Sequence, residues 1–401
     1  MIHITDKRNC CGCAACVQRC PKQCISLKED EEGFLYPFVD ENICIGCGLC
    51  EKVCPVLHQP DTGRKPIAVY AAKNKDEEIR RNSSSGGVFS ALAERTINEG
   101  GVVFGACFDD KWEVIHAYAE TSEDLEKFRG SKYVQSRIGN TYKEAEEFLK
   151  SGRPVLFSGT PCQIAGLKLF LRKEYTNLLT VDIICHGVPS PGVWRKYLKE
   201  EIARQMRKMR LPLRHPITDI KIESISFRDK TLGWKKYSFA LIITRTNYNG
   251  WKSVITFRTP NDKNPYMRGF LENIYLRPSC FTCPAKCGKS NSDITIGDFW
   301  GIEHITPEID DNKGVNCILI NTKHGEGFIA DLSLTKYEAS YDGICKYNES
   351  LIKSSHFNFK SNKFYSDYKT KGVITSISIL TRKSLYIQFR ELIHNILPNK
   401  N

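Results

Sequence analysis

The spacing of apolar and polar residues predicts two different kinds of structure along the chain. In the first 58 residues the apolar runs are short and are broken by turn-forming residues. We expect three short strands there, at residues 2–4, 24–27 and 34–39. The last two flank an acidic and glycine-containing turn, which predicts a β-hairpin. A polar, proline-containing stretch at 59–66 is typical of a linker.

Beyond the linker, buried-type apolar runs alternate with segments of helical periodicity up to residue 209. The predicted strands lie at 67–72, 102–107, 114–119, 154–158 and 179–185. The predicted helices lie at 88–99, 122–128, 141–151, 161–173 and 191–209, and Ser122 is a plausible N-cap. Strands that alternate with helices indicate βαβ units and a mostly parallel sheet.

The pattern changes to strict alternation between residues 218 and 259, which is typical of antiparallel strands. We expect these strands at 220–225, 237–244 and 253–257. Residues 262–276 have the periodicity of a helix. Residues 374–396 predict an amphipathic helix, which we interpret as packed against the core rather than lying on a membrane.

Two cysteine runs of identical spacing, C-x2-C-x2-C-x3-C-P, lie in the first 58 residues. This is the spacing of ferredoxins that hold two [4Fe–4S] clusters, in which the fourth cysteine of each run binds the other cluster. We therefore assign one cluster to Cys10, Cys13, Cys16 and Cys54, and the other to Cys44, Cys47, Cys50 and Cys20. Zinc sites usually have separated C-x2-C pairs, and disulfides would imply secretion. Cys11 and Cys24 fall outside the spacing and are interpreted as small buried thiols, although Cys11 can compete with Cys10.

The cysteine content predicts metal ligation in a reducing cytoplasm. The chain has 401 residues and 18 cysteines, and we see neither a signal peptide nor an apolar stretch long enough to span a membrane. The formal charge of +12 falls to about +6 if three clusters each contribute about −2. Residues 351–401 contain nine lysines or arginines and two acidic residues. A basic balance of this kind usually means a solvated face, and it also suits an acidic partner protein, an anionic coenzyme or a membrane surface. No nucleic-acid-binding module is recognisable.

Two glycine-containing loops precede predicted helices, where backbone N–H groups favour anions. Residues 83–87 read Ser-Ser-Ser-Gly-Gly, and Gly159-Thr160-Pro161 joins a predicted strand to a helix. Each loop alone is a weak signal, and a turn such as Ser-Ser-Ser-Gly-Gly is more often a helix cap than a phosphate site. Neither matches the dinucleotide-binding fingerprint or the P-loop.

Five further cysteines suggest a third cluster. Cys280 and Cys283 form a C-x2-C pair with Cys287 close behind, while Cys162 and Cys185 each end a predicted parallel strand. The ends of parallel strands meet at one edge of a sheet, so these thiols can converge. The alternative is a zinc-binding C-x2-C pair with Cys162 and Cys185 in the core. Cys107, Cys317 and Cys345 are interpreted as structural.

The sequence resembles the family of coenzyme F420 hydrogenase/dehydrogenase beta subunits, in the bacterial form with a fused dicluster ferredoxin domain. The resemblance extends to about residue 305 and rests on the motifs at 83–87, 130–136, 155–163, 185–187, 280–283 and 293–298. It implies FAD beside a [4Fe–4S] cluster held by Cys162, Cys185, Cys280 and Cys283. Cys287 departs from the family pattern and is either a substitute ligand or a bystander.

The resemblance also implies a fold class, which is an α+β ferredoxin-like dicluster domain followed by an α/β flavin- and cluster-binding domain with an antiparallel β insertion. The expected units are residues 1–58, 67–210, 211–305 and a mixed basic region at 306–401. Residues implied to bind the flavin are Ser84, Ser85, Gly86, Gly87, Lys132, Gly159, Thr160 and Asp298. Lys132 is expected to stabilise reduced flavin, and His186 to donate a hydrogen bond or relay a proton. Both also have ordinary structural explanations.

These patterns lead to the hypothesis of an iron–sulfur flavoprotein oxidoreductase. Electrons would pass between the ferredoxin-type clusters, the third cluster and FAD, to or from an organic two-electron substrate or coenzyme. The expected protein partner is an electron donor or acceptor such as ferredoxin or a partner subunit, and a homo-oligomer is left open. Two rival hypotheses are a non-catalytic electron-transfer subunit and an iron–sulfur redox-sensing or scaffolding protein.

Overall fold

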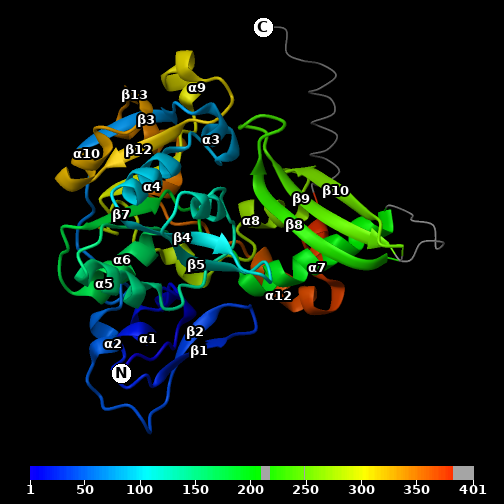
Figure 1. The fold of residues 1–401 in the computed structure, drawn as a ribbon. Coiled ribbons are helices and arrows are strands. Elements are labelled where there is room, and N and C mark those ends of the chain that lie inside the picture. Colours follow the sequence, from blue (N-terminus) through cyan, green and yellow to red (C-terminus); the bar gives the residue numbers. More distant parts are fainter. Residues whose placement is uncertain (209–216, 248, 383–401) are drawn as a thin grey trace.

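A large sheet forms the centre of the protein in the computed structural model, which describes residues 1–208, 217–247 and 249–382. Its strands in chain order are β3 (Ala68–Asn74), β4 (Val102–Phe108), β5 (Val114–Ala119), β6 (Val155–Gly159), β7 (Leu178–Ile183), β11 (Ile294–Asp298), β12 (Asn316–Ile320) and β13 (Leu334–Glu338). The order across the sheet is β13-β3-β12-β11-β7-β6-β4-β5. Figure 1 shows the N-terminal cysteine-rich segment below this sheet and a second sheet beside it.

The central sheet is mixed, so the prediction of a mostly parallel sheet is wrong. Strands β4, β6, β7 and β11 run parallel to their neighbours within that group. Antiparallel pairs flank them: β5 returns from β4 as a hairpin, and β12 lies between β11 and β3. Strands β12 and β13 lie beyond residue 305, yet both belong to this sheet. Apolar strand patterns carry no information on strand direction, which explains the error.

Helices cover both faces of the sheet, as βαβ units require. On one face, α4 (Val88–Asn98) and α10 (Lys323–Ile329) pack on residues such as Val103 and Leu156. On the other face, α5 (Thr141–Lys150) and α6 (Pro161–Leu171) pack on Phe104 and Phe157. Consecutive residues of one strand thus pack into the cores on opposite faces of the sheet. The cysteine-rich segment adds Cys11, Cys13 and Val53 to the second core, which fixes that segment against α6.

Two local predictions need correction. Residues 122–128 form a 3₁₀ helix, η2 (Glu123–Phe128), in which Ser122 makes no capping bond. The Thr121 hydroxyl accepts the Asp124 N–H instead, at 3.3 Å. Residues 262–276 contain the shorter helix α8 (Pro265–Leu271), because the chain adopts a left-handed conformation at Asn273. A short helix, α3 (Glu77–Asn82), was not expected.

The N-terminal segment contains the predicted hairpin, β1 (Ile25–Glu29) with β2 (Leu35–Val39). Its short helices are η1 (Lys7–Asn9), α1 (Ala15–Arg19) and α2 (Leu49–Lys52). The predicted strand at 2–4 is absent from the described residues. The backbone there turns to the cysteines instead, since the Ile2 N–H donates to Cys50 Sγ at 3.3 Å.

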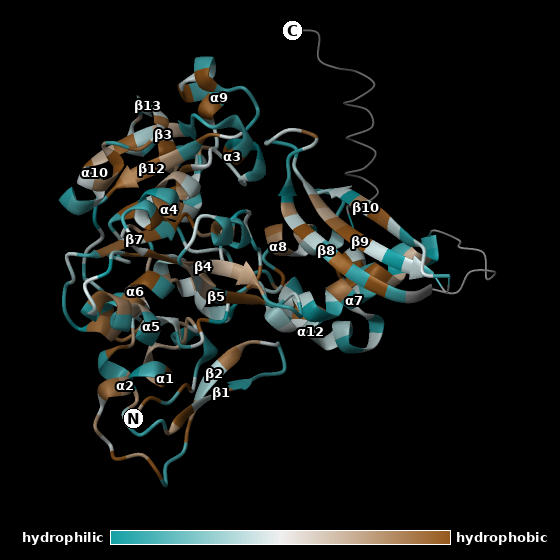
Figure 2. Cartoon of the chain, in the orientation of Figure 1, coloured by the Kyte–Doolittle hydropathy of each residue, from teal (hydrophilic) through white to brown (hydrophobic). Residues whose placement is uncertain are grey.

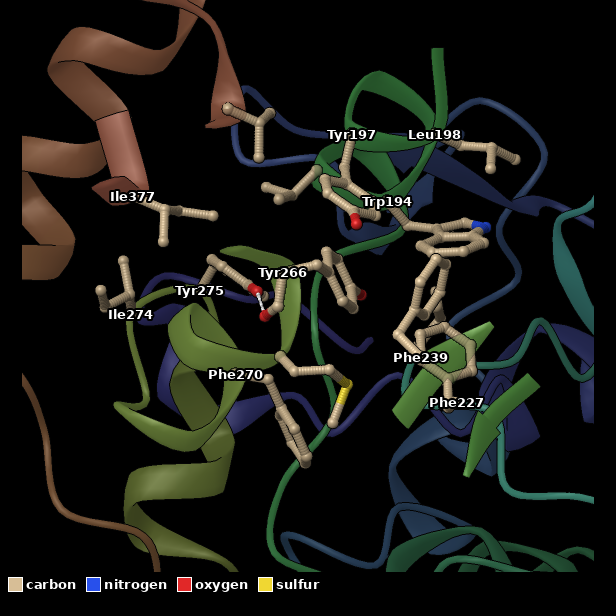
Figure 3. Packing of buried hydrophobic residues seen from close by; sticks show 14 of the residues in the cluster. Trp194, Tyr197, Leu198, Phe227, Phe239, Tyr266, Phe270, Ile274, Tyr275 and Ile377 are labelled. Atoms are coloured by element: carbon tan, nitrogen blue, oxygen red, sulfur yellow. Dashed lines mark hydrogen bonds between the residues drawn. The ribbon is translucent and has the colours of Figure 1, made fainter. Parts of the chain in front are cut away.

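A second, antiparallel sheet has the strands β8 (Ile217–Asp229), β9 (Ser238–Asn247) and β10 (Lys252–Pro260), with β9 in the middle. Their residues alternate in hydropathy along the strands (Figure 2). An aromatic core joins this sheet to α7 (Pro191–Lys208) and α8, including Trp194, Phe227 and Tyr266. Figure 3 shows the core closely, with the Tyr275 hydroxyl donating to the Tyr266 carbonyl.

The remaining described helices lie between residues 278 and 380 of the chain. They are η3 (Pro278–Thr282), α9 (Ile302–Ile305), η4 (Pro307–Ile309), α11 (Tyr341–Tyr347), η5 (Glu349–Leu351), α12 (Lys360–Lys371) and α13 (Val373–Leu380). Residues 383–396 of the predicted amphipathic helix lie outside the described residues, and so does residue 209. Within the described part of the chain, no helix combines the length and the apolar character needed to cross a bilayer.

Candidate functional site

The first cysteine loop and Cys54 come together as predicted. Gly12 and Ala14 adopt left-handed conformations that turn the loop before α1, which carries Cys16. Burial raises the pKa of Cys16 to about 12, and the neighbouring Cys10 and Cys54 thiols add to this rise. Metal binding at such thiols releases their protons. The predicted set Cys10, Cys13, Cys16 and Cys54 therefore shares one environment.

The second cysteine loop lines a small cavity near the surface. Its lining includes all four predicted ligands of the second cluster, Cys20, Cys44, Cys47 and Cys50. Cys47 is exposed, so this cavity reaches solvent. Cys24 also lines the cavity, with its Sγ 3.4 Å from that of Cys20. Cys20 of the first run thus lies beside three cysteines of the second run.

The four cysteines expected to hold a third cluster converge from three parts of the chain. Cys162 lies in the first turn of α6, Cys185 follows β7, and Cys280 and Cys283 belong to or follow η3. Burial raises the pKa of Cys185 to about 12 and that of Cys283 to about 11. The thiols of Cys162, Cys185 and Cys283 all add to the raised pKa of Cys280. These four thiols are therefore close neighbours.

Cys287 faces away from that group. Its thiol donates to the Ile352 carbonyl at 3.3 Å, and its backbone carbonyl accepts the Arg64 N–H at 2.9 Å. Cys345 is its neighbouring cysteine. The geometry makes Cys287 a bystander that ties the 59–66 segment to the C-terminal region. Cys107 and Cys317 are buried in separate hydrophobic cores.

Cys11 joins the first group of cysteines to the third, a role that the sequence did not indicate. It is buried in the same cluster as Cys13 and Cys162, and the thiols of both influence its pKa. Gly166 of α6 leaves room for this approach, because a Cβ there would lie 2.9 Å from Cys13 Sγ. Gln135 fixes the loop by donating to the Cys11 carbonyl at 3.0 Å. The only sign of this role in the sequence was that Cys11 directly follows Cys10.

A cleft of about 620 Å³ opens beside the third group of cysteines, and Cys185 lines it. Most of the residues expected to bind flavin also line it, namely Ser84, Ser85, Gly87, Lys132, Gly159, Thr160 and Asp298. His186 lies on the same wall. Gly86 does not face the cleft. It packs between strands, where a Cβ would lie 2.5 Å from the Ala72 carbonyl oxygen.

Hydrogen bonds shape the wall formed by the two serine-containing loops. The Ser84 hydroxyl accepts the Ser131 N–H at 2.6 Å, which joins the 83–87 loop to the 130–136 motif. The Ser85 hydroxyl donates to the Val315 carbonyl at 2.8 Å and is therefore engaged. Thr160 begins α6 with a capping box that includes Gln163. Of the two serines, Ser84 is the one whose hydroxyl is directed at the loop that borders the cleft.

Two basic side chains at the cleft have lowered pKa values. Burial lowers the pKa of Lys132 to about 7, and its ammonium donates to the carbonyls of Lys127 and Arg129 at 2.9 and 3.0 Å. Burial also lowers the pKa of His186, whose Nε2 lies 2.6 Å from the Asn273 amide oxygen. A group that titrates near neutral pH, such as Lys132, suits proton transfer.

Asp298 is held in an ion pair with the buried Arg228, which the sequence did not reveal. Arg228 Nη1 donates to Asp298 Oδ2 at 2.9 Å, and the Trp234 indole N–H donates to Oδ1 at 3.0 Å. The guanidinium also lies over the rings of Tyr237 and Trp300. Arg228, Tyr237 and Trp300 line the cleft. Asp298 therefore orients an aromatic and cationic wall.

His116 should make the stability of the protein depend on pH. Its Nε2 donates to the Ser158 carbonyl at 3.0 Å, and burial lowers its pKa from 6.5 to about 4. Below pH 6.5 His116 gains a proton in the unfolded chain but not in the folded chain. The free energy of unfolding therefore decreases as the pH is lowered. We expect a loss of about 2 kcal/mol between pH 6.5 and 5 from this residue.

Chemical unfolding of wild type and His116→Asn at both pH values measures this contribution. The variant lacks the titrating group and should lose less stability over the same interval. Equal losses in the two proteins would contradict the assignment of this pH dependence to His116.

The cysteine groups and the cleft define an iron–sulfur redox protein, and comparison with known families gives its class. Residues 9–57 match the 4Fe-4S dicluster domain. Residues 69–141 and 152–340 match the N-terminal and C-terminal parts of the coenzyme F420 hydrogenase/dehydrogenase beta subunit. The chain belongs to the family of coenzyme F420 hydrogenase/dehydrogenase beta subunits and carries an N-terminal domain for two [4Fe–4S] clusters. The family resemblance seen in the sequence is thereby confirmed.

Two relatives illustrate the similarity. One of the subunits of the F(420)H(2) dehydrogenase of Methanosarcina mazei is 29% identical over 121 residues, which is 29% of this chain. The chain spans about a third of the length of that curated relative (33%). A chain of the F420-reducing [NiFe] hydrogenase complex from Methanosarcina barkeri aligns with a TM-score of 0.45 and 17% identity, covering 74% of this chain and 91% of that chain.

Proposed function

We propose that the protein is an iron–sulfur flavoprotein oxidoreductase in which Cys162, Cys185, Cys280 and Cys283 hold a third [4Fe–4S] cluster. Electrons would pass through the second and first N-terminal clusters to the third cluster and then to FAD in the cleft. The observation that carries this proposal is the position of the third cysteine group. Cys11 links Cys162 to the first group, and Cys185 lines the cleft on the other side.

The cleft suits FAD in size and in chemistry. Its volume of about 620 Å³ lies within the usual range for small-molecule sites, about 300–1,000 Å³. The 83–87 loop precedes the N-terminus of α4, and Gly159-Thr160 precedes α6, so both present helix N-termini to a pyrophosphate. Bound FAD would exchange single electrons with clusters and electron pairs with an organic partner.

The residues of the cleft can manage protons and orientation. Lys132 carries part of its positive charge at neutral pH, so it can stabilise negative charge or release a proton. The Asn273 amide oxygen fixes His186 as a hydrogen-bond donor at Nε2. Arg228 and its aromatic neighbours form a planar, cationic wall for an organic ring or an anionic group.

An anaerobic reductive titration tests this proposal. Three clusters and one flavin should accept about five electrons per chain, one at each cluster and two at the flavin. Bleaching of the flavin absorption should accompany the reduction of the clusters. A capacity of about two electrons would indicate that the chain holds the two N-terminal clusters but neither a third cluster nor a flavin. That result would overturn the proposal. Coenzyme F420 and nicotinamide coenzymes are the first organic partners to offer, since the names of the family and of the curated relative include F420.

A non-catalytic electron-transfer subunit is the second candidate, and the surface around Cys47 favours it. Ile45 is 61% exposed, and Ile43 and Leu57 are also exposed. Apolar side chains around an exposed cluster site suit the docking of a redox partner, such as a ferredoxin or a partner subunit. Both candidate functions require reduced thiols, so we place the protein in the cytoplasm. Turnover of an organic coenzyme by the isolated chain would favour the oxidoreductase over the non-catalytic subunit.

A further inference from the structure

Arg277 is a buried cation at the junction of the N-terminal segment and the large sheet. Its side chain is 1% exposed. It donates to the Cys10 carbonyl at 2.7 Å, to Cys10 Sγ at 3.4 Å and to the Leu35 carbonyl at 3.0 Å. Gln135 Oε1 accepts a fourth bond at 2.9 Å. The guanidinium also lies over the rings of Tyr36 and Phe34, at 4.3 and 5.4 Å. Among the described residues no carboxylate pairs with it, so no protein anion of that kind balances its charge.

Lys286 is a second buried cation of the same kind, on the other side of the third cysteine group. It is 9% exposed, and its ammonium donates to the carbonyls of Cys185 and Ser350, both at 2.5 Å. Its charge opposes the rise in the pKa values of Cys185 and Cys283. The described part of the chain supplies no acidic partner for this lysine either.

Buried charges without a partner are strongly unfavourable, so each of these cations requires an anion that folding alone does not supply. A [4Fe–4S] cluster with four thiolates carries about −2 when oxidised and gains another negative charge on reduction. Arg277 contacts a ligand of the first cluster, and Lys286 lies beside the third cysteine group. A cation held there at low dielectric stabilises the reduced form more than the oxidised form.

The second cysteine group lacks a comparable cation among the described residues. Lys22 lines its cavity but is exposed, and the amino group of Met1 pairs with Glu51 at 3.1 Å. Water and salt screen charges in such positions. The two inner groups therefore differ from the outer group in the charge that surrounds them.

We propose that Arg277 and Lys286 are the counter-charges of the first and third clusters and raise their reduction potentials above that of the second cluster. Electrons that enter at the exposed second cluster are then driven inward, to the clusters nearest the cleft. Arg277 and Lys286 are positioning residues, since they act through the clusters. The part that concerns Lys286 rests on the proposed third cluster, while the part that concerns Arg277 needs only the dicluster domain.

A potentiometric titration followed by electron paramagnetic resonance tests this inference. Lys286→Met should lower the reduction equilibrium constant of the third cluster about tenfold, which is about 59 mV for one electron. Arg277→Gln should lower that of the first cluster by a similar factor. Lys286→Arg and Arg277→Lys keep the charge and should shift the potentials much less. Lys323→Gln is the matched control, because it removes one positive charge from a side chain that is 85% exposed.

The iron content of each protein separates the possible outcomes. Variants that keep about 12 irons and the wild-type potentials would overturn the inference while leaving the proposed function intact. If the wild-type protein holds about 8 irons, the proposal of a third cluster is wrong, and so is the role proposed for Lys286. Arg277 makes four hydrogen bonds at the junction. If Arg277→Gln loses its first cluster, the comparison of Lys286→Met with Lys286→Arg still decides whether buried charge sets a potential.

Discussion

Replacing Cys280 or Cys283 by serine is expected to remove about four irons per chain and to leave about eight. The two thiols lie with Cys162 and Cys185 in one group, where each influences the pKa of its neighbours. A [4Fe–4S] cluster that loses one of four thiolate ligands is strongly weakened. The N-terminal clusters have their own eight cysteines and should survive.

Cys287→Ser is the matched control for this experiment. Cys287 lies four residues beyond Cys283, but its thiol donates to the Ile352 carbonyl instead of joining the group. Its replacement should leave about 12 irons. Iron loss in Cys287→Ser together with full iron content in Cys280→Ser would show that the ligands are wrongly assigned.

Asp298→Ala should have the largest effect on stability, lowering the free energy of unfolding by about 3 kcal/mol or more. The substitution leaves the Arg228 guanidinium, whose side chain is 2% exposed, without its carboxylate. It also removes the acceptor of the Trp234 indole N–H. Because Arg228 and Asp298 line the cleft, bound flavin should decrease as well.

Chemical unfolding under anaerobic conditions measures this effect. Glu326→Ala removes the carboxylate of an exposed pair with Lys323 and should cost less than about 1 kcal/mol. The double variant Arg228→Met, Asp298→Leu removes both buried charges and should recover much of the lost stability. A single variant Asp298→Ala as stable as wild type would contradict the view that this pair holds the wall of the cleft.

Local patterns were sufficient to predict most of the elements. The hairpin of β1 and β2, the parallel core strands and the three antiparallel strands all lie close to their predicted positions. The sheet order was not predictable, because β12 and β13 join it from beyond residue 305 and pair antiparallel with β3. The run at 2–4 looked like a strand, but its backbone bonds with Cys50 instead.

The candidate site was predictable where cysteine spacing or strand ends marked it. Cys162 and Cys185 could be placed because each comes at the end of a parallel strand at the same edge of the sheet. Arg277, Arg228 and Cys11 could not, since their partners are distant in sequence or depend on how the N-terminal segment docks. Sequence patterns do not distinguish a buried arginine from an exposed one. Those residues became visible only once the elements were packed together.

The most direct test of the account is the iron and flavin content of the chain after strictly anaerobic purification. Three clusters that feed a flavin predict about 12 irons and one FAD per chain. A content of about 8 irons without flavin would contradict this prediction. The redox chemistry would then be confined to the N-terminal domain, and the cleft would have another ligand.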